Sequence, residues 1–219
     1  MASNFQQKLL LVLLAVVVLI SFFHYDQSYA AAAALVVPES GNFLEETCRH
    51  THFYDLCVSS LQSDSRSSSN TSDLKGLLRI SLDLATTNAS HILSYIDNLL
   101  DNYNTSSNLN LTSLEFCEED YGGYIATDLE WAIDAIYNNN NNNDGEDYEL
   151  ANSCIDEAIT STDFCKRGID FDHDVVVVQL EAAEPIIPEP LANMNDIMSK
   201  LLHISQDILC YLSPDSCRQ

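Results

Sequence analysis

The sequence predicts an all-α protein, an up-and-down four-helix bundle preceded by a disulfide-closed helical hairpin. Two features of the sequence support this fold class. The 219 residues include only six glycines and five prolines, too few for the many strand turns of a β-sandwich or barrel. Hydrophobic residues make up 46% of the chain, enough for the core of one domain, and they recur at the steps of three and four residues that amphipathic helices show.

The N-terminus carries an apolar run, Leu9 to Phe23, that follows Lys8 and precedes Ser28-Tyr29-Ala30. Small residues at both ends of that tripeptide fit a signal peptidase site. The run is shorter than the roughly 20 residues of a membrane span and lacks a flanking basic stop. We therefore expect residues 1–30 to be a secretory signal peptide. The mature protein would be secreted, without a membrane partner once the signal is removed, and its cysteines could pair in an oxidising environment.

Residues 31–72 are expected to form the helical hairpin and a linker. Cys48 and Cys57 lie nine residues apart around a short break at Thr51-His52, a spacing small enough to close a hairpin. The segment from Gln62 to Ser72 is rich in serine and has no apolar side chain. The bundle is expected over 73–219, with the whole of 39–219 forming one domain.

The first bundle helix begins after Asp73, a residue suited to the N-cap position. Its apolar residues alternate steps of four and three, which keeps one stripe facing a partner helix. The stripe consists of Leu78, Leu82, Ala85, Ala89, Ile92, Ile96 and Leu99.

The second helix is expected from about Leu111, with Thr112 as a candidate cap, to the tract Asn138 to Asn143. Six consecutive asparagines have poor helix propensity and no apolar contact to make, so they predict an exposed loop. The apolar face of this helix is predicted to carry Cys117, Tyr121, Ile125, Leu129, Ala132 and Ile136.

The third helix is predicted over about 147–162 and the fourth over about 191–212. The proline-containing segment Ile169 to Pro190 between them is predicted to be irregular. The expected apolar face of the fourth helix consists of Ile197, Leu201, Ile204, Ile208 and Tyr211.

The charge excludes one class of partner. The chain has 33 acidic and 9 basic residues and a net charge of −24. Phosphate contacts need clusters of Lys and Arg, so we expect no nucleic-acid partner.

Catalytic, cofactor-binding and metal sites are not expected. Cys154 has no evident histidine partner, and His50-Thr51-His52 is too closely spaced for two ligands on one helix face. Asp172-His173-Asp174 offers no further ligand nearby. Glu118-Glu119-Asp120 could mimic an acid and base pair, but a solvated helix face is the simpler interpretation. We therefore expect a protein that is not an enzyme.

Four Asn-X-Ser/Thr triplets fit a secretory route, because they are acceptors for N-linked glycans. Their asparagines are Asn70, Asn88, Asn104 and Asn110. Asn88 falls inside a predicted helix, where an unmodified surface asparagine is the alternative.

Several motifs in order resemble the plant invertase and pectin methylesterase inhibitor family. They are the Cys-x8-Cys hairpin from Cys48 to Cys57, the helix opening Asp73-Leu74-Lys75-Gly76-Leu77-Leu78, Cys117 followed four residues later by Tyr121, and the stretch from Asp147-Tyr148 to Phe164-Cys165. The resemblance covers most of Cys48 to Leu212. In its register Cys165, not Cys154, is the fourth cysteine of the family pattern.

The resemblance implies two disulfides, Cys48–Cys57 and Cys117–Cys165. With seven cysteines in a secreted chain, at least one is left over. Cys210 and Cys217 could form a third pair across Pro214, which would leave Cys154 as a buried thiol.

The resemblance also implies a function, which is to block an enzyme by binding it. The expected partner of this apoplastic protein is a cell-wall pectin methylesterase, bound one to one by the monomer across its substrate cleft, with Glu119 and Tyr121 in contact. An acid invertase is the alternative target, and a helical interaction protein without inhibitory activity is the alternative of another class. The chain departs from the family pattern at Gly123 and Ala126, and it lacks the Pro-Lys-Phe tripeptide of invertase inhibition.

Overall fold

The computed structural model describes residues 39–68, 73–103, 111–137, 147–167 and 187–218. All regular structure in these ranges is helical, and no strand occurs in them. The predicted all-α class is therefore confirmed. The expected signal peptide, the asparagine tract and most of the segment 169–190 lie outside the described residues. None of the described helices is long and apolar enough to cross a bilayer.

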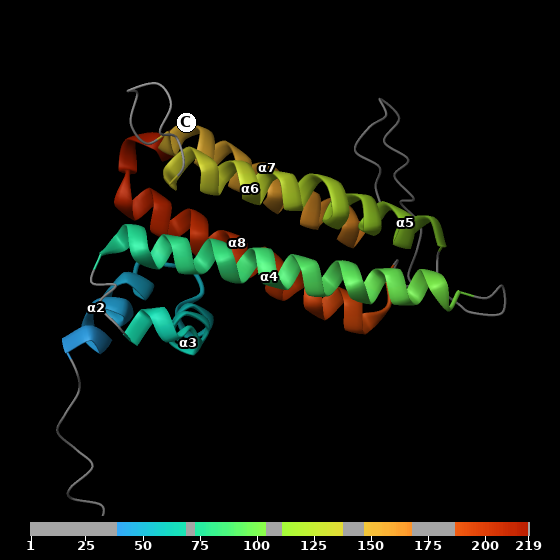
Figure 1. Cartoon of the computed structure of the whole chain (residues 1–219), viewed down its shortest axis with the longest axis horizontal. Coiled ribbons are helices and arrows are strands. Elements are labelled where there is room, and N and C mark those ends of the chain that lie inside the picture. The colour runs from blue at the N-terminus through green and yellow to red at the C-terminus, as the bar shows by residue number, and fades with distance from the viewer. Residues whose placement is uncertain (1–38, 69–72, 104–110, 138–146, 168–186, 219) are drawn as a thin grey trace, which may run out of the picture. The chain divides into compact units, whose positions relative to one another are not determined.

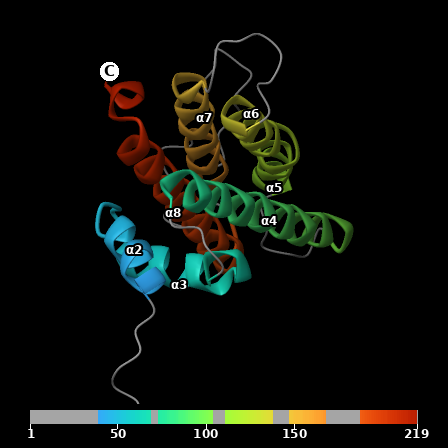
Figure 2. The same ribbon diagram turned by 60° about the vertical axis from the view of Figure 1, so that its left-hand side comes forward.

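Four long helical segments run up and down beside one another (Figure 1). They are α4 (Leu74–Asp101), the pair α5 (Leu111–Glu119) and α6 (Ile125–Tyr137), α7 (Tyr148–Arg167), and α8 (Glu189–Leu212). The segment η2 (Asp120–Tyr124), a π-helical turn, joins α5 to α6. α8 packs against α4 and α7, and α6 packs against α7 and α4, so each segment has two neighbours, as Figure 2 shows from another side.

Helix α4 begins and packs as its sequence predicts. The Asp73 side chain accepts a hydrogen bond from the Gly76 amide at 2.5 Å, which satisfies one of the donors left open at a helix start. The predicted stripe is buried from Leu78 to Ile96, and Leu99 is half-buried against the same core.

The predicted apolar face of α8 is partly wrong. Ile197 and Tyr211 are exposed, because the helix turns a face shifted by one residue toward α4 and α7. The other three predicted residues, Leu201, Ile204 and Ile208, are buried as expected. The buried face also includes Leu191, Asn195, Met198, Leu202, Ser205 and Leu209. Asn195 and Ser205 are polar, so a search for apolar residues alone misses this register.

The ends of three helices differ in detail from the prediction. α7 continues five residues beyond 162, so Cys165 lies within the helix. Thr112 is the second residue of α5 and not its cap. α8 begins at Glu189 after Pro188, with a proline in its first turn, a position where the missing amide is not needed.

The N-terminal hairpin consists of α2 (Glu39–Cys48) and α3 (Tyr54–Ser63), followed by η1 (Ser65–Ser68), a 3-10 turn. A Cys48–Cys57 disulfide joins its two helices, and α3 packs against α4 and α8. Within the segment expected to be a linker, Arg66 binds Asp64 and reaches Asp83 of α4 at 2.6 Å.

Two further disulfides are present. Cys117 of α5 is bonded to Cys165 of α7, and Cys210 of α8 is bonded to Cys217 of η3 (Pro214–Cys217). Cys154 is a buried free thiol. These are the pairs that the family resemblance and the odd cysteine count suggested.

Candidate functional site

Tyr121 lies in the core and cannot contact a partner. Only 1% of its surface is exposed, and its hydroxyl donates a hydrogen bond to Oδ1 of Asn195 on α8 at 2.7 Å. Burial raises the pKa of this phenol, with a further contribution from Asp120. The expectation that Tyr121 binds the target is therefore wrong for the folded chain. The same residue had been placed on the apolar face of the helix, and that placement is correct.

Tyr121 instead belongs to a buried polar chain that ties three helices together. The Asn195 amide donates to the Thr162 carbonyl of α7 at 2.9 Å, so one side chain links η2, α7 and α8. The Cys117–Cys165 disulfide joins α5 to α7 in the same region. Buried polar groups that are fully hydrogen-bonded favour one arrangement of the helices. The outer surface of α5 and α6 is thus presented by a fixed scaffold.

The two glycines that follow Tyr121 lie in the π turn. Gly122 and Gly123 are exposed. A Cβ at Gly122 would meet Leu93 of α4 at 3.5 Å, and one at Gly123 would meet nothing within 4 Å. Neither position needs glycine for space. They leave two adjacent surface positions without side chains.

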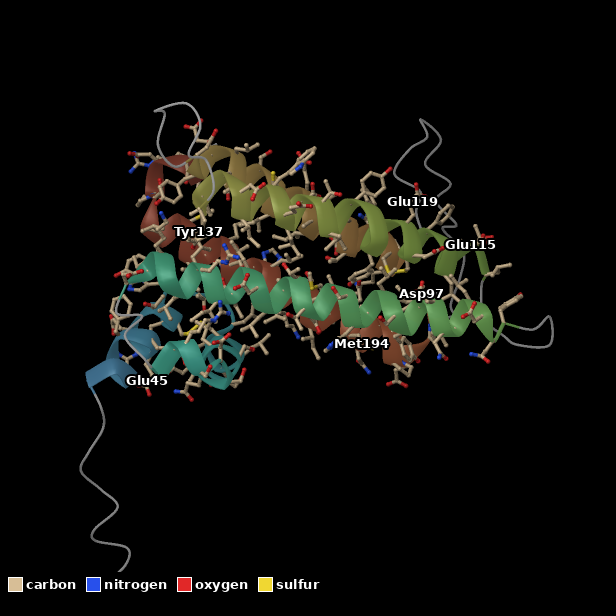
Figure 3. All side chains as sticks on the ribbon, in the orientation of Figure 1. Glu45, Asp97, Glu115, Glu119, Tyr137 and Met194 are labelled. Atoms are coloured by element: carbon tan, nitrogen blue, oxygen red, sulfur yellow. A yellow bond between two sulfur atoms is a disulfide. The ribbon has the colours of Figure 1, made fainter. Side chains whose placement is uncertain are left out.

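Glu119 is exposed on α5, as a partner-binding residue must be. Glu115 lies one turn earlier on the same helix, and Asp97 lies on α4 at the same end of the bundle (Figure 3). Every charged residue of α5, η2 and α6 is acidic. This surface would attract a basic partner and repel an acidic one.

The surface where α4 and α6 meet, away from Glu115 and Glu119, carries charges of both signs. A shallow groove there is lined by Arg79, Asp83, Thr86, Thr87, Ala126, Glu130, Ile133 and Asp134. Arg79 donates to Asp83 at 3.0 Å and lies over the ring of Tyr137 at 5.1 Å. Tyr137 in turn donates to the Lys75 carbonyl at 2.5 Å. The cations of α4 are therefore engaged within the chain, and the groove has no concentration of positive charge.

A second acidic group lies where α6 meets α7. Asp128 is 7% exposed, and burial, followed by the charge of Glu157, raises the pKa of its carboxyl to about 6. Cys154 lies nearby, and burial together with Asp128 raises the pKa of its thiol to about 11. Because the thiolate is the reactive form, Cys154 is a poor nucleophile at physiological pH.

Two exposed apolar side chains on α6 and α7 were not singled out from the sequence. They are Trp131 and Leu150, which are 55% and 46% exposed. The sequence did contain an indication that Trp131 is exposed. Trp131 lies outside the predicted apolar face of its helix, which contains Leu129, Ala132 and Ile136. A large aromatic residue off the buried face of a helix indicates a surface that contacts something else.

The exposed helix faces carry carboxylates and a few large apolar side chains. Within the described ranges, no group of three or more His, Cys, Asp or Glu could hold a metal ion. Six cysteines are in disulfides and the seventh is buried. Aromatic side chains such as Trp131 are enriched at the centre of protein interfaces, whereas charged groups lie mostly at the rim.

Of the four glycan acceptors, only Asn88 lies in the described residues. It is half-buried on α4, and its Nδ2, the atom that would carry the glycan, lies 3.6 Å from Sδ of Met198 on α8. A glycan on this atom would have to displace that contact, so the fold disfavours it. Asn70, Asn104 and Asn110 lie outside the described residues.

The fold defines the class of the protein as a disulfide-linked helical bundle. A family model described as plant invertase/pectin methylesterase inhibitor matches residues 42–208, and the chain therefore belongs to this family. Its members are proteinaceous inhibitors and not enzymes.

Two curated relatives match a shorter part of the chain. It is 45% identical over 53 residues to the cell wall / vacuolar inhibitor of fructosidase 2 of Arabidopsis thaliana, and 42% identical over 55 residues to pectinesterase inhibitor 28 of Oryza sativa subsp. japonica. These matches cover 24% and 25% of this chain, and 28% and 23% of the relatives. The chain thus matches about a quarter of the length of each relative.

The fold is similar to that of a solved structure. A mutant form of a pectin methylesterase inhibitor from Arabidopsis superposes with a TM-score of 0.54 at 17% sequence identity. The superposition covers 74% of this chain and 91% of that chain. At this identity the similarity concerns the fold alone.

Proposed function

We propose that the protein is a secreted inhibitor of pectin methylesterase, which it binds one to one across the substrate cleft without forming a covalent bond. The observation that carries this proposal is the family match over 42–208 on a scaffold whose cysteines are bonded or buried. A rigid bundle loses little conformational entropy on docking, so an interface of ordinary size can give tight binding. Glu119 would lie in this interface.

The charge of the chain favours pectin methylesterase over invertase. A surface in which α5, η2 and α6 carry only acidic charges suits a basic target. The two curated relatives are named for different targets and have similar identities, so they do not separate these candidates. Acid invertase is the second candidate because one of these relatives is an inhibitor of fructosidase.

The location follows from the same proposal. A chain that enters the secretory route through residues 1–30 would reach the cell wall, where its disulfides stay oxidised. Asn70, Asn104 and Asn110 would then be available for glycans.

An inhibition panel tests the proposal. Purified, oxidised protein is added to several plant pectin methylesterases and acid invertases at pH 5 to 6 and low salt, and residual activity is measured over a range of inhibitor concentrations. We expect saturable inhibition of at least one pectin methylesterase, which weakens as salt is raised. Reduced and alkylated protein is the control and should not inhibit. If only invertases are inhibited, the second candidate is correct.

Full activity of every enzyme in the panel would contradict both candidates. The chain would then be a helical interaction protein without inhibitory activity. The Gly122-Gly123 stretch, which has no side chains to reach into a cleft, is the feature of the described surface that fits this third outcome.

A further inference from the structure

Trp131 and Leu150 are large apolar side chains that the core of the bundle does not use. Trp131 is on α6 and is more exposed than any other large hydrophobic side chain of the described residues. It is also the single tryptophan of the chain. An exposed tryptophan leaves a large apolar area in water, and such areas often mark binding surfaces.

The two side chains lie at the same level of adjacent helices. The Asp147 amide, just before α7, donates to the Ala135 carbonyl of α6 at 3.1 Å. α6 and α7 run in opposite directions and pack side by side. One turn back from Ala135 is Trp131, and one turn forward from Asp147 is Leu150. Equal steps along antiparallel helices keep these residues next to one another.

They also lie on the facing sides of the two helices. Asp128 of α6 and Glu157 of α7 interact electrostatically across the helix contact. Trp131 lies three residues after Asp128, and Leu150 lies seven residues before Glu157. Residues three, four or seven apart share one side of a helix. Trp131 and Leu150 therefore lie at the outer edge of the contact between α6 and α7.

The surroundings of this pair are acidic. α6 has no Lys or Arg, and α7 has only Lys166 and Arg167, in its last turn at the far end from Leu150. The exposed acidic residues in this part of α6 and α7 include Asp134, Glu149 and Glu157. An apolar centre within a charged rim is the usual organisation of a protein interface.

We propose that Trp131 and Leu150, hereafter the Trp131–Leu150 patch, form the energetic centre of the interface with the target enzyme and receive a Lys or Arg side chain of that enzyme. This rests on the proposed inhibitory function and identifies the part of the bundle that performs it. The indole face would take the cation, and the rim carboxylates would exclude an acidic surface while guiding a basic one. Tryptophan is among the residues that most often dominate binding energy.

The test compares inhibition constants for variants against an enzyme that the wild-type protein inhibits. Trp131→Ala and Leu150→Ala remove the patch, and Trp131→Phe keeps an aromatic face. Ile197→Ala is the matched control, because Ile197 is an exposed apolar residue on α8 at 45% exposure. Since all three positions are on the surface, folding should be retained, and circular dichroism and thermal unfolding verify this.

We expect Trp131→Ala to raise the inhibition constant at least tenfold, Leu150→Ala to raise it less, and Trp131→Phe to restore part of the loss. Ile197→Ala should stay within twofold of the wild type. Protein labelled with 5-fluorotryptophan gives a direct readout, because its single fluorine resonance reports Trp131 alone. That resonance should shift when unlabelled enzyme is added.

Two results would overturn the inference, and they differ in what they imply. An unchanged inhibition constant for Trp131→Ala, with a fluorine resonance that the enzyme does not shift, would show that the target binds another face while the inhibitory function stands. A wild-type protein that inhibits no enzyme of the panel would overturn the proposed function, and this inference with it.

Discussion

The four-helix bundle and the N-terminal hairpin are held in place by different kinds of contact. The bundle has long helices with continuous buried faces, the Tyr121–Asn195–Thr162 hydrogen bonds and a disulfide between α5 and α7. The hairpin has two ten-residue helices. Among its described side chains it contributes only Leu44, Cys48, Cys57 and Leu61 to the buried apolar core that it shares with the bundle, and it docks in addition through exposed groups. His52 contacts Asp207 at 2.9 Å, and the ring of His50 stacks on Tyr211 with centroids 4.0 Å apart.

This difference indicates where rigidity lies. Buried contacts that join several helices break only when the whole domain unfolds, whereas short elements with exposed contacts open locally at a lower free-energy cost. The faces of α5, α6 and α7 are on the rigid part, where a surface keeps its shape on binding.

The largest effect is expected from removing the Cys117–Cys165 disulfide with Cys117→Ser and Cys165→Ser together. This bond closes a loop with a sequence separation of 48. Loop-closure entropy gives a loss of about 4 kcal/mol in the free energy of unfolding, measured by urea denaturation.

The Cys48→Ser and Cys57→Ser pair is the control. Its loop has a sequence separation of only 9, which gives about 2.5 kcal/mol by the same relation. Its loss should also accelerate amide exchange mainly in α2 and α3. Equal losses for the two pairs, with uniform exchange, would mean that the hairpin and the bundle unfold as one unit.

The sequence predicts most of the bundle because its core is largely apolar. The stripe of α4 and the face from Cys117 to Ile136 are buried as expected. The spacing on this second face also indicates the π turn. Three successive steps of four residues separate Cys117, Tyr121, Ile125 and Leu129. An α-helix has 3.6 residues per turn, so such a run drifts around the helix unless a wider turn absorbs the excess.

The parts that were predicted wrongly involve polar core residues and surface aromatics. Asn195 and Ser205 occupy core positions because they bond to Tyr121 and Ser81, and pairings between distant segments are not readable from one sequence. Tyr121 was assigned to the partner surface although its place on the apolar face already indicated burial. The proximity of Trp131 and Leu150 depends on how α6 and α7 pack, which spacing alone does not give.

An intermediate effect is expected from Asp128→Asn in the bundle. The pKa of Asp128 is about 6 in the folded chain, against an ordinary value of 3.8. Between these pH values the folded state keeps a proton that the unfolded state has lost, so stability falls as pH rises toward 6 and stays lower above it. Asp128→Asn removes this cost and should be more stable than the wild type by about 1 to 3 kcal/mol at pH 7.

Urea denaturation from pH 4 to 7.5 measures this difference. At pH 4 the two proteins should be nearly equal, since Asp128 is then protonated in the folded wild type. Glu130→Gln, at an exposed position of the same helix, should show no such pH-dependent gain. A constant difference between Asp128→Asn and the wild type at all pH values would refute the electrostatic origin of the effect.

The smallest effect is expected at the hairpin, from Asp207→Ala. Asp207 accepts hydrogen bonds from the His52 amide and interacts with its ring, both at 2.9 Å. Because the contact is exposed, its loss should lower the free energy of global unfolding by less than about 1 kcal/mol. Amide exchange should nevertheless accelerate severalfold around His52, since the local opening loses the bond that protects that amide. Asp215→Ala removes a more exposed pair with Arg218 at the same end of the chain and should leave exchange in the hairpin unchanged. Acceleration by both variants would show that the His52–Asp207 contact does not anchor the hairpin.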